Sequence, residues 1–125
     1  MLPVSDVVLV VDDDAAVRAS LKFALEVEGF KVSLYDRASA LLADTNLPKR
    51  ACLVVDYRMP DIDGVELLER LRAVNVGFPA ILISGRVSRP LRALAERLGF
   101  TAVLEKPLSD AALVETIRTA LASTR

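Results

Sequence analysis

The sequence predicts a single α/β domain in which helices cover both faces of a parallel β-sheet. Five short apolar segments alternate along the chain with five amphipathic segments. The connections between them are short, so successive strands are expected to be joined by right-handed crossovers and to run parallel. With 125 residues, 53% hydrophobic and 26% charged, the chain also has the size and composition of one folded domain.

The predicted strands are short runs rich in β-branched and aliphatic residues. Residues 7–11 show no polar and apolar alternation, as expected for a strand that is buried on both faces. Residues 31–35 do alternate, which places this strand near an edge of the sheet. The remaining predicted strands are residues 52–55, 79–83 and 102–104.

The predicted helices carry apolar residues at helical spacing. The first contains Val17, Leu21 and Leu25, and Gly29 follows as a C-terminal stop. The second is short, from residue 37 to about residue 44. The other three have predicted core faces at Val65, Leu68 and Leu71; at Leu91, Leu94, Ala95 and Leu98; and at Leu113, Ile117, Ala120 and Leu121.

Composition argues against several functions. The formal net charge of -1 gives no electrostatic reason to expect nucleic acid or an anionic membrane as the main partner. The absence of histidine removes most zinc sites and Ser-His or Cys-His catalysis. The single cysteine, Cys52, lies in an apolar run and is predicted to be a buried thiol. The longest plain apolar run is too short to span a bilayer and the N-terminus lacks a basic signal-peptide opening, so we expect a cytoplasmic protein.

Polar residues follow the carboxyl ends of four predicted strands. Ligands of open α/β sheets bind outside these ends, so the residues there are the candidates for chemistry. Three carboxylates converging on one crevice repel one another and raise each other's pKa unless a positive charge compensates. Oxygen ligands favour a hard divalent cation, here Mg²⁺. The residues at the strand ends are Asp12, Asp13, Asp14, Asp56, Ser84 and Lys106.

The same residues are suited to phosphoryl chemistry. A carboxylate can act as a nucleophile and form an acyl phosphate. Lys106 could then neutralise charge on the phosphoryl group, and the Ser84 hydroxyl could hydrogen-bond one of its oxygens. Asp56 directly follows a buried apolar run, where turn chemistry does not account for a carboxylate.

Four short motifs lie at the strand ends: the acidic pair Asp12 and Asp13, residues 56–64, residues 84–85 and residues 106–107. In this order they resemble the receiver domains of two-component response regulators, over nearly the whole chain. Details such as residues 58–61 are similar to the nitrogen-fixation (FixJ-like) subfamily, whose members usually carry a C-terminal helix-turn-helix. The resemblance implies one receiver domain over residues 1–125 with a flavodoxin-like, CheY-like (βα)5 fold and strand order 2-1-3-4-5.

The resemblance also implies residue roles around a metal ion. Asp56 would accept a phosphoryl group from a sensor histidine kinase. Asp13 would bind Mg²⁺ directly, and Asp12 would act largely through metal-bound water. Asp56 itself and the backbone carbonyl of Arg58 would complete the protein ligands.

Ser84 and Lys106 would bind the phosphoryl oxygens, and the peptide bond from Lys106 to Pro107 would be cis. Such a protein is a signalling module, not an enzyme, because it catalyses only its own phosphorylation and dephosphorylation. Its expected output is control of transcription through an effector domain absent from this chain. The output face would be the fourth helix, fifth strand and fifth helix, which is also the expected surface of a homodimer. Direct binding to nucleic acid or to a membrane is not expected.

Some polar residues have simpler explanations. Asp14 is predicted to cap a helix, and Asp61 and Asp63 are predicted to serve a turn and a helix cap. Val103 occupies the position three before Lys106 where family members often place an aromatic, so an aromatic switch is not expected there. Four arginines follow Ser84 and form either a solvated face or a docking surface: Arg86, Arg89, Arg92 and Arg97. Arg58 and Arg86 are expected to overhang the site.

Two other functions fit parts of the pattern. A phosphorylation-independent interaction module would keep the fold without the switch, although all the acceptor-site residues are present. A haloacid-dehalogenase-like phosphotransferase also forms an aspartyl phosphate, and Asp12 and Asp14 supply its Asp-x-Asp spacing. This chain is too short for the cap domain of such an enzyme. The sequence fits both a stand-alone receiver and a fragment of a longer regulator.

Overall fold

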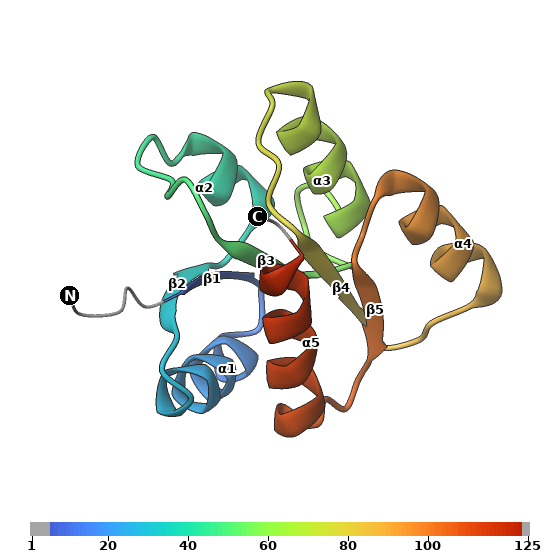
Figure 1. Cartoon of the computed structure of the whole chain (residues 1–125). Helices are drawn as coiled ribbons and strands as arrows, with labels where there is room; N and C mark the ends of the chain where they lie inside the picture. Colours follow the sequence, from blue (N-terminus) through green and yellow to red (C-terminus); the bar gives the residue numbers. More distant parts are fainter. Residues whose placement is uncertain (1–5, 124–125) are drawn as a thin grey trace.

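The computed structural model describes residues 6–123, so the predicted domain bounds of 1–125 extend past the described residues at both ends. Strands and helices alternate throughout, and the strands form one parallel sheet in the predicted order β2-β1-β3-β4-β5 (Figure 1). The elements are β1 (Val7–Val11), α1 (Ala15–Val27), β2 (Lys31–Tyr35), α2 (Ala38–Ala43), β3 (Cys52–Asp56), α3 (Gly64–Ala73), β4 (Ala80–Ser84), α4 (Arg89–Leu98), β5 (Ala102–Glu105) and α5 (Asp110–Ala122).

Helices cover both faces of the sheet. Helices α1 and α5 lie on one face, and α2, α3 and α4 lie on the other (Figure 1). Because successive strand side chains point to opposite faces, β1 contributes Leu9 and Val11 to one core cluster and Val8 and Val10 to the other. This two-sided burial explains why the central strands lack alternation, whereas β2 lies at the sheet edge as predicted.

The central strands are packed with small and aliphatic side chains. Every residue of β3 and β4 is buried. Cys52 is part of this core, and burial raises the pKa of its thiol to about 12. The thiol therefore stays protonated and contributes packing, as predicted.

Residues at the helix ends explain where the helices begin and stop. The Asp14 carboxylate accepts hydrogen bonds from the backbone N–H groups of Ala16 and Val17 and so caps α1, as predicted. Gly29 and Gly99 follow α1 and α4 with φ angles of 94° and 93°, a left-handed conformation that glycine adopts without a Cβ penalty. Within residues 6–123, the structure contains no helix with the length and apolar character needed to cross a bilayer.

Three strands differ from the prediction by one residue at one or both ends. Strand β4 starts at Ala80, after Pro79, which has no N–H to give to a ladder. Strand β3 includes Asp56, which lies opposite Ile83 of β4. Strand β5 likewise continues to Glu105. The candidate phosphoacceptor is therefore held in the sheet ladder itself.

Candidate functional site

Three carboxylates meet at the carboxyl edge of the sheet. Asp12 follows β1, Asp13 comes next, and Asp56 is the last residue of β3. Each offers an oxygen atom within 4.8 Å of those of the other two. Asp12 and Asp56 are buried, with 2% and 8% of their surface exposed, whereas Asp13 is exposed. The structure therefore brings together the three carboxylates that the sequence predicted to converge.

Asp12 is held by contacts on several sides. Its N–H donates to the carbonyl of Tyr35 (3.1 Å), and its Oδ1 accepts from the N–H of Asp14 (2.9 Å). Burial, together with the nearby charge of Asp56, raises the pKa of Asp12, while the Asp14 N–H and the Lys106 ammonium act in the opposite direction. The net rise indicates that protein groups do not fully compensate this carboxylate.

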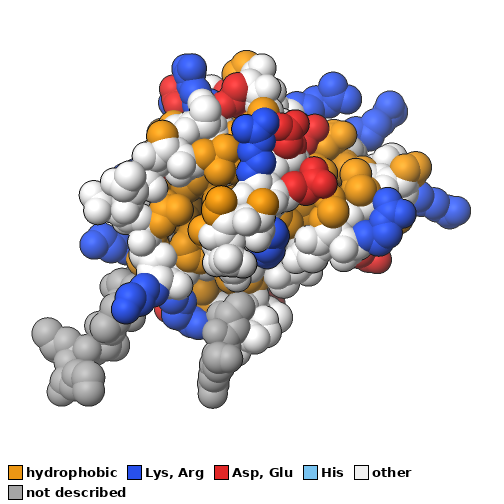
Figure 2. Space-filling view, turned by 90° about the horizontal axis from the view of Figure 1, so that it is seen from above, with side chains coloured by type: hydrophobic (Ala, Val, Ile, Leu, Met, Phe, Trp, Pro, Cys, Tyr) orange, Lys and Arg blue, Asp and Glu red, His pale blue; other side chains and the backbone are white. Residues whose placement is uncertain are grey.

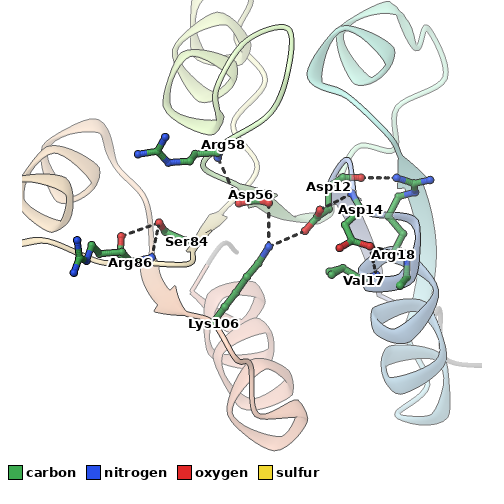
Figure 3. A network of polar contacts seen from close by, with 10 residues as sticks. Asp12, Asp14, Val17, Arg18, Asp56, Arg58, Ser84, Arg86 and Lys106 are labelled. Carbon is green, nitrogen blue, oxygen red and sulfur yellow. Dashed lines mark hydrogen bonds and ion pairs between the residues drawn. The ribbon is translucent and has the colours of Figure 1, made fainter.

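Lys106 bridges two of the carboxylates from the end of β5. Its Nζ lies 3.0 Å from Asp56 Oδ2 and 3.5 Å from Asp12 Oδ2 (Figure 3). Although burial opposes its charge, the hydrogen bond to Asp56 and the charges of both carboxylates raise the pKa of Lys106. Its peptide bond to Pro107 is cis, as the resemblance implied.

The backbone around Asp56 is closely packed. Its Oδ1 accepts from the N–H of Arg58 at 3.4 Å, and the next residue, Tyr57, donates its N–H to the carbonyl of Ile83 at 2.7 Å. A Cβ atom on Gly64 would come within 2.7 Å of the Asp56 carbonyl oxygen, so this approach requires glycine. The Arg58 side chain extends away from Asp56 (Figure 3). The expectation that it overhangs the site is therefore not met in this conformation.

Ser84 lies at the same sheet edge, but its hydroxyl is engaged within its own loop. Its Oγ donates to the carbonyl of Arg86 (2.8 Å) and accepts from the N–H of the same residue (3.3 Å). The Arg86 guanidinium points away from Asp56, so it does not overhang the site in this conformation (Figure 3). The N–H of Val87 donates to Glu105 Oε1 at 2.8 Å, which ties this loop to the end of β5.

Two site contacts were not predicted from the sequence. Besides the Glu105 contact, Arg18 Nη1 donates to the backbone carbonyl of Asp12 at 2.7 Å. The first turn of α1 gives a signal for the second contact, because helical side chains lean toward the helix N-terminus. Arg18 stands four residues after the cap Asp14 and so leans toward the end of β1.

Two further carboxylates stabilise the scaffold. Asp63 accepts from the N–H of Glu66 at 2.8 Å and caps α3, as predicted. Asp61 accepts from the N–H of Ser39 at 2.8 Å and so joins this loop to the start of α2. Although desolvation opposes it, hydrogen bonding to Ser39 and to the local backbone lowers the pKa of Asp61 to about 2. Asp63 therefore has the predicted capping role, whereas the sequence did not predict the contact of Asp61 with α2.

The donor set fits a hard divalent cation. Three carboxylates face one ammonium group, that of Lys106, in this cluster. All the candidate ligand atoms are oxygen atoms, and Mg²⁺ is usually held by one or two carboxylates while it keeps several waters. The exposed carboxylate of Asp13 lets water reach the cluster from the solvent side.

Comparison with known proteins agrees with this arrangement. The response regulator receiver domain profile matches residues 8–118. The transcriptional regulatory protein FixJ of Bradyrhizobium diazoefficiens is 42% identical over 114 residues, which cover 91% of this chain and 56% of that protein. FixJ of Azorhizobium caulinodans is 43% identical over 121 residues, which cover 96% and 57%. The crystal structure of FixJ-N has a TM-score of 0.88 at 35% identity and covers 98% of both chains. The chain thus spans about half the length of these curated relatives.

Proposed function

This chain belongs to the response regulator receiver domain family, and we propose that it is switched by phosphorylation of Asp56 by a sensor histidine kinase. A receiver domain is a signalling module of a two-component system and not an enzyme that acts on other substrates. The observation that carries the proposal is the position of Asp56 at a strand end, 3.0 Å from the Lys106 ammonium and within a group of three carboxylates. We assign residues 1–125 to this one domain, acting in the cytoplasm.

The proposed transfer begins on a phosphohistidine of the kinase. This chain contains no histidine that could carry the phosphoryl group itself. An Asp56 carboxylate oxygen attacks the phosphorus, a P–O bond forms and the P–N bond breaks. The imidazole leaves with the electron pair and is protonated. Lys106 already hydrogen-bonds Asp56 Oδ2, and its ammonium would neutralise charge on the phosphoryl oxygens. Attack by water on the phosphorus later returns inorganic phosphate and the free carboxylate.

We propose that the cation is Mg²⁺, held by Asp12, Asp13, Asp56 and the backbone carbonyl of Arg58. When bound, it supplies positive charge that offsets carboxylate repulsion and stabilises phosphoryl oxygens. Asp12 would offer an oxygen whose position its backbone and side-chain contacts restrict. Asp13 would bind the cation directly, from the solvent side.

The proposed switch requires Ser84 to change its hydrogen-bond partner. To reach a phosphoryl oxygen, its hydroxyl must leave the Arg86 carbonyl, which frees the loop between β4 and α4. Val103 is buried in the same core cluster as Leu91 and Ala95 of α4. The switch would therefore act through the loop and α4 without an aromatic residue at position 103.

The proposed output face consists of α4, β5 and α5. Figure 2 shows Lys and Arg side chains gathered on the side where α4 lies in Figure 1. The exposed arginines of α4 are Arg89, Arg92 and Arg97. We propose that this face forms a homodimer or contacts an acidic surface. The output would be control of transcription by a separate effector domain, because the relatives above are named transcriptional regulatory proteins.

Phosphate incorporation tests the proposed function. The chain is incubated with acetyl phosphate and Mg²⁺, and its intact mass is measured. We expect the wild-type chain to gain one phosphoryl group, and both Asp56→Asn and chelation of the metal to prevent the gain. Asp61→Asn is the matched control and should still be phosphorylated, because Asp61 lies outside the group of three carboxylates and hydrogen-bonds Ser39.

Two results would contradict the proposal. A folded wild-type chain that gains no phosphoryl group would indicate the phosphorylation-independent interaction module. Undiminished incorporation in Asp56→Asn would indicate a different acceptor.

A further inference from the structure

Arg18 of α1 contacts the backbone of the candidate cation site and is not itself a candidate ligand of the cation. Its Nη1 donates to the backbone carbonyl oxygen of Asp12 at 2.7 Å, and Figure 3 shows its guanidinium directed at this backbone. The residue is half-buried in the first turn of α1. This contact joins the helix to the segment that carries two of the three carboxylates.

The contact restricts Asp13 more than Asp12. The Asp12 carbonyl belongs to the planar peptide unit that joins Asp12 to Asp13. A hydrogen bond to its oxygen therefore restricts the orientation of the backbone at Asp13. Asp12 has independent hydrogen bonds to Tyr35 and Asp14. Asp13 is exposed, yet its carboxylate has an oxygen within 4.8 Å of those of Asp12 and Asp56.

We propose that Arg18 is a positioning residue of the cation site, which directs the Asp13 carboxylate toward Asp12 and Asp56. The inference rests on the proposed function, because it takes these carboxylates to be the ligands of a divalent cation. It adds a residue that never touches the cation but determines how tightly the cation is held.

The charge of Arg18 and its hydrogen bond to Asp12 have opposite expected effects on Mg²⁺ affinity, so substitution of Arg18 can distinguish them. A guanidinium near the site repels a cation, so loss of the charge alone would tighten Mg²⁺ binding. Loss of the hydrogen bond would let the peptide before Asp13 rotate and would weaken binding. The direction of the change therefore distinguishes a positioning residue from a merely nearby charge.

The experiment measures the Mg²⁺ dissociation constant by calorimetry or by amide chemical shifts. We expect Arg18→Met to weaken Mg²⁺ binding roughly tenfold, a size found for partners of metal ligands. Arg18→Lys should restore part of the affinity, because it keeps a charged donor. Lys22→Met is the matched control: it removes a charge from the same helix, where Lys22 pairs with Glu26, and should leave binding within about twofold.

Unchanged or tighter binding in a folded Arg18→Met variant would overturn the inference. If that variant does not fold, Arg18→Gln, which is too short to reach the Asp12 carbonyl, carries the same expectation. Asp13→Asn separates this result from failure of the proposed function. Wild-type binding that Asp13→Asn abolishes and Arg18→Met spares would reject only the role of Arg18. A wild-type chain that does not bind Mg²⁺ would reject the cation site itself.

Discussion

Charged side chains from the ends of β1, β3 and β5 contact one another and form what we call the first side of the site, although β4 lies between β3 and β5 in the sheet. Lys106 lies 3.0 Å from Asp56 and 3.5 Å from Asp12. On the other side, at the end of β4, the Ser84 hydroxyl hydrogen-bonds Arg86 two residues along the chain. Both sides lie at the same edge of the same sheet, and the loop after β4 is itself tied to β5 by the Val87 N–H to Glu105. Only on the first side, however, do the candidate site side chains contact one another across strands.

The difference separates two tasks. On the first side Lys106 attracts Asp12 and Asp56 across the sheet, so these contacts are already present before a phosphoryl group arrives. The second side has a neutral hydroxyl in a local contact, and exchange of one such hydrogen bond for another changes the free energy by only about 1 kcal/mol. We infer that the first side performs phosphoryl transfer and that the second side changes its hydrogen bonds in response to the phosphoryl group. The predictions below test this division, from the largest expected effect to the smallest.

Loss of Lys106 should affect phosphorylation most. Lys106→Met leaves the carboxylates of Asp12 and Asp56 without their shared ammonium and removes a donor for the phosphoryl group. We expect the initial rate with acetyl phosphate to fall roughly a hundredfold, as when one transition-state donor is removed. Intact-mass time courses measure the rate, with Lys22→Met as the control. A fall of less than about threefold would contradict the role assigned to this side.

Two glycine substitutions compare packing on the two sides. Gly64→Ala would place a Cβ 2.7 Å from the Asp56 carbonyl oxygen, whereas a Cβ at Gly85 would meet no atom of residues 6–123 within 4 Å. We expect Gly64→Ala to lower the free energy of unfolding by about 1–3 kcal/mol through overpacking. Gly85→Ala should change it by less than about 0.5 kcal/mol. Urea unfolding measures both, and equal effects would contradict a difference in packing.

Loss of the Ser84 hydroxyl should have a smaller effect on rate than loss of Lys106. Ser84→Ala removes a neutral donor that must first leave the Arg86 carbonyl. We expect phosphorylation to slow by about three- to tenfold, since a neutral hydrogen bond contributes roughly half as much as a charge-assisted one. The same time courses measure the change. If phosphorylation slowed as much as in Lys106→Met, Ser84 would belong to the phosphoryl-transfer chemistry and not to the conformational response.

A tyrosine on β2, the strand beside the first side, stabilises the fold through its hydroxyl. The Tyr35 hydroxyl donates to Asp44 Oδ2 at 2.6 Å, and the Tyr35 carbonyl accepts the Asp12 N–H. Burial and the Asp44 carboxylate raise the pKa of Tyr35 to about 12. We expect Tyr35→Phe to lower the free energy of unfolding by about 1 kcal/mol at pH 7.

The sign of the pH dependence follows from the raised pKa. The stabilisation is complete below about pH 10, the ordinary pKa of tyrosine, and is lost as pH rises through the folded pKa of about 12. Urea unfolding at a series of pH values should therefore show the wild-type and Tyr35→Phe curves converging across this range. Parallel curves would contradict the assignment.

The sequence predicted the sheet and the convergence of the site, because both follow from patterns along the chain. Buried strands lack alternation, and parallel strands bring their carboxyl ends to one edge. Those two facts place Asp12, Asp56 and Lys106 at one edge of the sheet, and the strand order that the family resemblance implied brings them close together.

The sequence did not predict which hydrogen-bond partners and orientations individual side chains adopt. Ser84 was expected to face the phosphoryl site, yet its hydroxyl bonds Arg86. Arg58 and Arg86 were expected to overhang the site and instead extend away from it (Figure 3). These choices depend on local loop geometry, where hydrogen bonds of similar free energy compete and residue type alone does not select among them.

Identification of the residue that carries the acyl phosphate tests the central claim most directly. The chain is phosphorylated with acetyl phosphate and Mg²⁺, reduced with borohydride to convert an aspartyl phosphate to homoserine, digested and analysed by mass spectrometry. We expect homoserine at position 56 alone. Homoserine at position 12 would contradict the assignment of Asp56 and favour the Asp-x-Asp chemistry of a haloacid-dehalogenase-like phosphotransferase.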